Sequence, residues 1–135
     1  MALQYSVAVR NAGLDARETA IGASPVLRLR SGAPPANCAA ARTGTVLATL
    51  NLPSDWMAAA SAGVKAMSGT WQDLSADAAG TIGHFEIMDN GVATCHMQGT
   101  VTATGGGGDM TVDNVVVAVA QQINVTSFQV TAGNA

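Results

Sequence analysis

Two histidines and a cysteine are the side chains of this sequence best suited to hold a transition metal: His84, His96 and Cys95. They flank Asp89-Asn90-Gly91, which predicts a β-hairpin because Asn-Gly adopts positive φ with little strain. A two-residue loop pairs His84 with Met97 and places the two histidines on opposite faces of the sheet. A three-residue loop would place them opposite each other and would allow a shared metal. We favour the first register and therefore predict no metal and no cofactor.

Other patterns typical of catalysis or ion binding are incomplete. The sequence has no Gly-x-Ser-x-Gly elbow. Residues 108–114 resemble a calcium loop but lack its twelve-residue order and closing Glu, so we expect Asp109 and Asp113 to cap turns. The glycine run 105–108 is not followed by Lys-Ser or Lys-Thr, so it predicts a flexible connector and no phosphate loop. The sequence therefore does not predict an enzyme.

Two tryptophans, Trp56 and Trp71, are the largest apolar side chains of an alanine-rich chain. Trp71 lies within a strand pattern, so we expect it in the core, where a Trp buries about 150 Å² or more. Trp56 follows a Pro-Ser-Asp turn, and its position stays open between the core and an interface. An exposed Trp56 would also suit stacking on a sugar.

Charge is sparse and unevenly distributed along the chain. Charged residues make up 11 % of the sequence, whereas an average soluble domain has about 25 %. Six basic and three acidic residues give positions 1–65 a charge of +3, and six acidic residues give positions 66–135 a charge of −6. Two halves of opposite charge favour pairing between copies of the chain. The absence of a basic cluster argues against binding to nucleic acid.

Cysteine content and hydropathy indicate a compartment. Cys38 and Cys95 are too few for a disulfide framework. The first five residues lack the basic and apolar regions of a signal peptide, and the longest apolar run, 115–120, is far short of the roughly 20 residues that span a bilayer. We therefore expect synthesis in a reducing cytoplasm, free thiols and no membrane association.

Residues from about 3 to 21 predict one α-helix. Leu3, Val7, Leu14 and Ile21 follow heptad-like spacing, and Gly22 is a helix stop. Such a helix either packs across its own sheet or docks on a neighbouring copy.

From about residue 25 to 131 the pattern is that of short strands. In the first of them, Leu27 and Leu29 alternate with Arg28 and Arg30, as in a half-buried strand. The predicted strands are 26–30, 45–51, 64–67, 70–74, 82–88, 92–101, 110–112, 115–120 and 123–131. A short helical turn is expected in the alanine-rich stretch after Pro53. These elements predict one mainly β domain over 1–135, an antiparallel β-sandwich or small barrel with one N-terminal α-helix.

Eight stretches in their order along the chain resemble a family of small virion structural proteins of tailed bacteriophages. They are RNAGLDA at 10–16, LRLRSGAPP at 27–35, GTVLA at 44–48, GTW at 69–71, GHFEIMD at 83–89, CHMQGTV at 95–101, GDMTVDN at 108–114 and NVTSF at 124–128. The resemblance implies a virion component, and we expect a head decoration protein that stabilises the capsid. A tail or baseplate component is the first alternative, and a glycan-binding adhesion module using Trp56 is an alternative of another class.

The expected partners are copies of the chain itself and other virion proteins, such as the major capsid protein. The resemblance supplies no functional residues. Charge and residue type nominate interface residues instead: Arg28, Arg30, Arg42, Trp56, Asp109 and Asp113.

Overall fold

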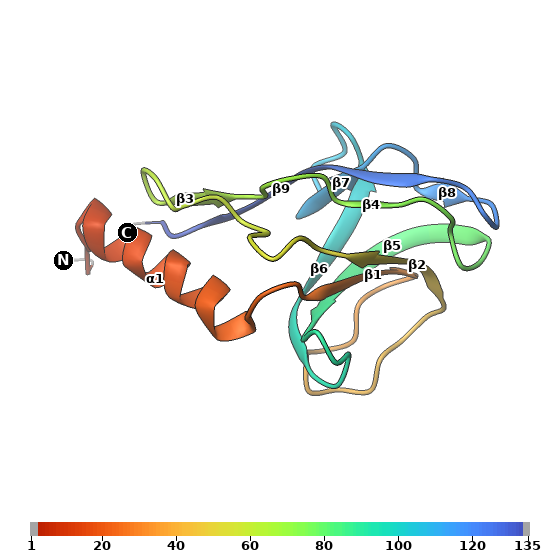
Figure 1. The fold of residues 1–135 in the computed structure, drawn as a ribbon, viewed down its shortest axis with the longest axis horizontal. Helices are drawn as coiled ribbons and strands as arrows, with labels where there is room; N and C mark the ends of the chain where they lie inside the picture. The colour runs from red at the N-terminus through yellow and green to blue at the C-terminus, as the bar shows by residue number, and fades with distance from the viewer. Residues whose placement is uncertain (1–2, 134–135) are drawn as a thin grey trace.

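The computed structural model describes residues 3–133 and is mainly β, with one N-terminal helix and a curled, half-barrel sheet (Figure 1). This confirms the predicted fold class. The elements are α1 (Val7–Ile21), β1 (Val26–Ser31), β2 (Val46–Asn51), β3 (Val64–Ala66), β4 (Gln72–Asp73), β5 (Gly80–Met88), β6 (Cys95–Ala103), β7 (Met110–Val112), β8 (Val116–Val117) and β9 (Ile123–Thr131).

Helix α1 begins at Val7, four residues later than the apolar spacing predicts, and it ends where the sequence predicts. The hydroxyl of Ser6 accepts a hydrogen bond from the Val9 amide and caps the N-terminus. Gly22 has a φ of 96° and donates its amide to the Glu18 carbonyl. Within residues 3–133, no helix has the length and apolar character needed to cross a membrane.

The strands form one continuous path in the order β2-β1-β5-β6-β7-β9-β3, with β4 paired to β9 and β8 paired to β5. All pairs are antiparallel except β6 with β7. Strand β5 lies between β1 and β6, and Glu86 is aligned with Arg28 on one side and with Gln98 on the other. This alignment places three polar side chains on one face of the sheet.

The predicted two-residue hairpin loop at Asn90-Gly91 is wrong. In β5 and β6, Ile87 pairs with Met97 and His84 with Thr100, so the connection is longer than either loop considered from the sequence. The carboxylate of Asp89 accepts the amides of Ala93 and Thr94 at 2.7 and 2.6 Å. A side chain that caps a longer turn outweighs the local preference of Asn-Gly.

The helical turn expected after Pro53 is also absent from the described residues. Met57 instead bridges to Met67, and the chain reverses between Ser61 and Val64. Ala62 and Gly63 make this turn with positive φ. Alanine favours a helix locally, but bridging to the sheet fixes this stretch as extended backbone.

The hydrophobic core lies inside the curve of the sheet and is built around aromatic rings in tilted and edge-on contact. Trp71 lies 6.0 Å from Trp56 and 5.6 Å from Phe128, and Phe128 contacts Phe85 edge-on at 5.5 Å, measured between ring centroids. Leu27 and Leu29 of β1 are fully buried on this side. The core position predicted for Trp71 is therefore confirmed.

Candidate functional site

The face of β1, β5 and β6 that points away from the core carries a charged cluster. We call Arg28, Arg30, Arg42 and Glu86 the Glu86 cluster. Arg30 Nε lies 2.7 Å from Glu86 Oε1, Arg42 Nη1 lies 3.3 Å from Oε2, and Arg28 Nη1 lies 4.0 Å from Oε1. The Glu86 side chain is 0 % exposed, so its charge is compensated entirely by arginines of the same chain.

The segment 32–45 covers this face and is bound to it along its length. Gln98 Nε2 donates to the Pro35 carbonyl at 2.7 Å, and Arg30 Nη1 donates to the Gly44 carbonyl at 3.2 Å. His84 Nδ1 donates to the Gly32 carbonyl at 2.8 Å, since a carbonyl can only accept. We call residues 32–45 the cover loop. Arg30 and Glu86 of the Glu86 cluster, together with His84 and Gln98, therefore hold the cover loop on the sheet.

The three arginines nominated as interface residues differ in how far they remain available to another molecule. The Arg30 and Arg42 side chains are 11 % and 17 % exposed and hydrogen-bond to Glu86 and to backbone carbonyls. Arg28 is 29 % exposed and has the longest contact with Glu86. Three guanidinium groups around one carboxylate leave a local positive excess, and Arg28 is its most exposed member.

The remaining nominated residues have defined roles inside the chain. Trp56 is 1 % exposed, and its indole N–H donates to the Gly22 carbonyl at 3.0 Å. Of the two positions left open for Trp56, it takes the core, because the ring is buried and bonds to the end of α1; its nomination as an interface residue is therefore wrong. Asp109 accepts the amide and hydroxyl of Thr100 in β6, and Asp113 accepts the amide and side-chain amide of Asn124 in β9, so both stay exposed and bond to another strand.

The histidines do not meet. His84 is fully buried and aligned with Thr100, whereas His96 is exposed and lies four residues earlier on β6. At about 3.4 Å per residue, the two positions are offset by roughly 14 Å along the strands. Among residues 3–133, no group of three or more His, Cys, Asp or Glu side chains is placed to hold a metal ion.

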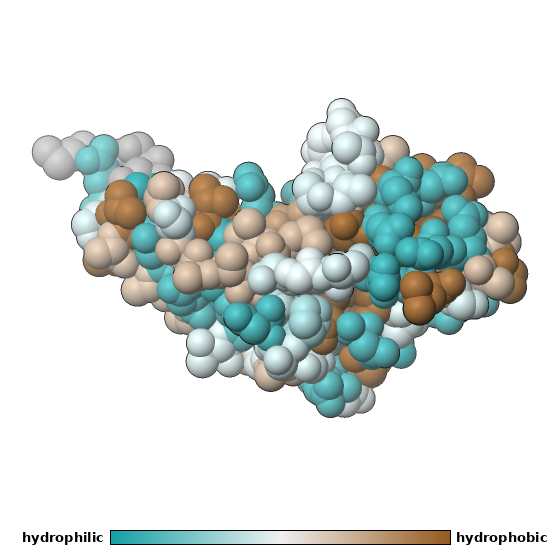
Figure 2. Space-filling model, turned by 45° about the horizontal axis from the view of Figure 1, so that its top comes forward, coloured by the Kyte–Doolittle hydropathy of each residue, from teal (hydrophilic) through white to brown (hydrophobic). Residues whose placement is uncertain are grey.

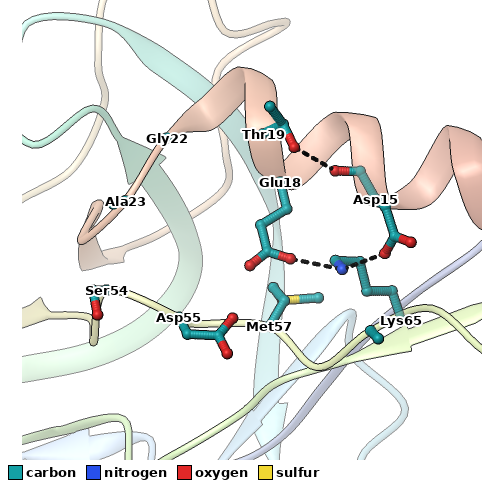
Figure 3. A pocket seen from close by; sticks show the side chains of 10 residues that line it. Asp15, Glu18, Thr19, Gly22, Ala23, Ser54, Asp55, Met57 and Lys65 are labelled. Atoms are coloured by element: carbon teal, nitrogen blue, oxygen red, sulfur yellow. Dashed lines mark hydrogen bonds and ion pairs between the residues drawn. The ribbon is translucent and has the colours of Figure 1, made fainter.

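A second polar site joins α1 to the sheet. An open hollow of about 450 Å³ lies between the C-terminal half of α1 and the segment leading into β3, with Asp15, Glu18, Asp55 and Lys65 among its walls (Figure 3). The Lys65 ammonium is buried and contacts Asp15 Oδ1 at 2.7 Å, Glu18 Oε2 at 2.6 Å and the Ala58 carbonyl at 2.8 Å. These three acceptors match the three donors of an ammonium, so Lys65 fastens the helix to β3.

The ionisation of this pair follows from its contacts. Burial alone would lower the pKa of Lys65, but the hydrogen bonds that it donates to Asp15 and Glu18, with the attraction of their charges, outweigh burial and raise the pKa. The hydrogen bond from Lys65, aided by the Ala60 amide, lowers the pKa of Asp15. An ammonium that stays charged and fully bonded suits a structural tie and not a nucleophile.

Exposed apolar side chains fall into two groups, one toward each end of the molecule. The helix-end patch consists of Leu3, Tyr5, Val7 and Val9, which are 72, 52, 46 and 53 % exposed. The loop-end patch consists of Leu74, Val116 and Val119, which are 67, 63 and 65 % exposed. The N-terminus of α1 and the loops around β8 lie at the two ends of the longest axis in Figure 1, and Figure 2 shows hydrophobic residues near both ends.

The structure adds residues that the sequence did not nominate. Glu86 was readable as a carboxylate at an inner position of a predicted strand, where an unpaired charge is costly. Lys65 gave no local signal, because its partners lie 47 and 50 residues earlier in the chain.

No family model, curated protein or solved structure matches this chain.

Proposed function

We propose that this chain is a structural protein of a tailed-bacteriophage virion, with head decoration as its first assignment. The resemblance of eight ordered stretches to small virion proteins supports the proposal. The charged fraction of 11 % supports it too, because a surface poor in charge is suited to being covered by partners. The clustered charges of the chain, around Glu86 and around Lys65, connect its own segments and present no reactive group.

The observation that carries the proposal is the pair of apolar patches at opposite ends of the long axis. Burying one leucine or valine side chain completely stabilises an interface by about 1.5–3 kcal/mol, so covering a patch of three or four apolar side chains favours association. Two different surfaces that meet head to tail form a heterologous contact, which closes into a ring or extends into a lattice. A particle component repeated in many copies needs such contacts.

Charge near the two patches is complementary. Arg10 and Arg17 lie on α1, beside the helix-end patch. Asp73, Asp77 and Asp113 lie in the segments that carry the loop-end patch. A head-to-tail contact therefore brings a basic rim to an acidic one, and a head-to-head contact would oppose like charges.

The structure bears differently on the two alternatives, a tail component and a glycan-binding module. A tail or baseplate component uses the same repeated contacts and differs only in its place in the particle. A glycan-binding module loses the residue on which it rested, because Trp56 is 1 % exposed and cannot stack on a sugar.

Purified particles of the bacteriophage that encodes the chain provide the test. Quantitative mass spectrometry should find the chain in fixed proportion to the major capsid protein. A labelled antibody should mark the head in electron micrographs, whereas marking of the tail would move the assignment to the alternative. Absence of the chain from washed particles would overturn the virion proposal.

A further inference from the structure

The two cysteines lie together although 56 residues separate them in the sequence. The Sγ atoms of Cys38 and Cys95 are 2.8 Å apart, and neither cysteine is fully exposed. A disulfide has an S–S distance of about 2.05 Å, so an approach of roughly 0.8 Å would join them. We propose that Cys38 and Cys95 are a disulfide-forming pair that locks the cover loop onto β6 under oxidising conditions.

The surroundings hold both sulfur atoms in position before any bond forms. Cys95 is the first residue of β6 and is aligned with Met88 of β5. Cys38 lies in the cover loop, next to Asn37, whose carbonyl accepts from Arg42 Nη2 at 2.8 Å. The other terminal nitrogen of Arg42, Nη1, lies 3.3 Å from Cys95 Sγ, so one guanidinium contacts both sides of the pair.

Loop anchors on either side of Cys38 reduce the entropy cost of closure. The Pro35 carbonyl accepts from Gln98 Nε2, and the Asn37 side chain accepts the amides of Ala39 and Ala40, both at 2.9 Å. The loop therefore needs no further ordering for the sulfurs to meet. Joining two positions so distant in sequence also restricts the unfolded chain, which stabilises the fold.

The chemistry is thiol–disulfide exchange with a small-molecule disulfide such as oxidised glutathione. The Cys38 thiolate attacks one glutathione sulfur, forms a mixed disulfide and releases one glutathione thiolate. The Cys95 thiolate then attacks the Cys38 sulfur and releases the second glutathione. The two cysteines lose two protons and two electrons, and oxidised glutathione is reduced to two glutathione molecules.

The order of attack follows from the surroundings of Cys95. Burial, aided by the contact with Cys38, raises the pKa of Cys95 to about 12, so Cys95 is a poor first nucleophile. It acts second, when the Arg42 guanidinium beside it favours the thiolate that forms. The proposal does not depend on the virion assignment, since it uses contacts within one chain.

The test is incubation of the purified full chain with oxidised glutathione, followed by intact mass measurement. We expect a mass lower by two hydrogen atoms, no retained glutathione, and a tryptic product in which peptide 31–42 is linked to peptide 66–135. The Cys95→Ser variant should instead retain one glutathione on Cys38. Unmodified thiols after oxidation, two retained glutathiones, or linkage only between chains would each overturn the proposal.

Stability supplies a second readout that does not depend on mass. The oxidised chain should unfold at a higher urea concentration than the reduced chain. A Cys38→Ala, Cys95→Ala double variant should show the same midpoint under both conditions, which separates the disulfide from any general effect of the oxidant. An equal midpoint for oxidised and reduced wild-type protein would contradict locking of the cover loop.

Discussion

Replacing Glu86 by glutamine isolates the charge that holds the cover loop. The substitution keeps the size and shape of the side chain and removes its negative charge. Arg30 and Arg42, 11 % and 17 % exposed, would then face each other across a neutral amide, with no other carboxylate of residues 3–133 in hydrogen-bonding contact. Removing one partner of a buried ion pair destabilises a protein by about 3–5 kcal/mol, and we expect Glu86→Gln to fall in this range.

Urea unfolding followed by circular dichroism measures the effect. With a slope of about 2 kcal/mol per molar urea, a loss of this size lowers the midpoint by roughly 1.5–2.5 M. Asp55→Asn is the matched control, because it makes the same chemical change at an exposed carboxyl group and should alter stability by at most about 0.5 kcal/mol. A Glu86→Gln midpoint within the error of the control would refute the role assigned to the cluster.

A double-mutant cycle sharpens this test. If Glu86 and Arg30 act through each other, the Arg30→Gln change should cost less in the Glu86→Gln background than in the wild type. Additive losses would show that the two side chains stabilise the fold separately and would contradict a shared cluster.

Three further predictions follow from the Lys65 contacts that join α1 to β3 and from the packing of the cover loop. The pKa of Asp15 lies below its ordinary 3.8, so its stabilising contribution is complete above pH 3.8 and is lost as the pH falls through the lowered pKa. Asp15→Asn should therefore flatten the acid side of the profile of stability against pH, measured by thermal melting. Lys65→Met should destabilise the protein by roughly 1.5–3 kcal/mol and raise hydrogen exchange in α1, whereas Arg17→Met, at an exposed position of the same helix, should leave exchange unchanged. Gly83→Ala should lower the urea midpoint, because a Cβ there would overlap the Gly32 carbonyl of the cover loop. Gly13→Ala, with open space around the new Cβ in α1, should raise the urea midpoint. A higher midpoint for Gly83→Ala than for Gly13→Ala would contradict the packing of the cover loop.

The alternation of side chains made the strands predictable from sequence. Leu27 and Leu29 point into the core and Arg28 and Arg30 point to the other face, as the period of two predicts. The strands at 110–112 and 123–131 agree with the structure residue for residue. Local patterns were sufficient here because alternate side chains enter the core, even where a strand such as β5 is buried on both faces.

The errors arose where a side-chain or bridge contact outweighs the backbone preference of the segment. Asn90-Gly91 favours a tight hairpin, but the Asp89 side chain caps a longer loop and moves the register of β6. The Ala-rich segment near Met57 favours a helix, but a bridge to Met67 holds it extended. Both outcomes rest on contacts that a local pattern does not contain.

The candidate site was only partly accessible from sequence for the same reason. Charge counts favoured pairing between copies, whereas Arg30 and Arg42 reach Glu86 of their own chain. Their partner lies 56 and 44 positions away, and only the neighbouring strands and the cover loop bring the three together. The loop also places Cys38 against Cys95, which no spacing rule predicts.

Self-association through the two apolar patches is the central claim, and the mass of the chain in solution tests it most directly. Light scattering over a range of concentrations should give a whole multiple of the single-chain mass. Val9→Asp in the helix-end patch should reduce that mass to one chain, while Ala103→Asp, at an exposed position outside both patches, should not. A single-chain mass for the wild type at every concentration would contradict the account.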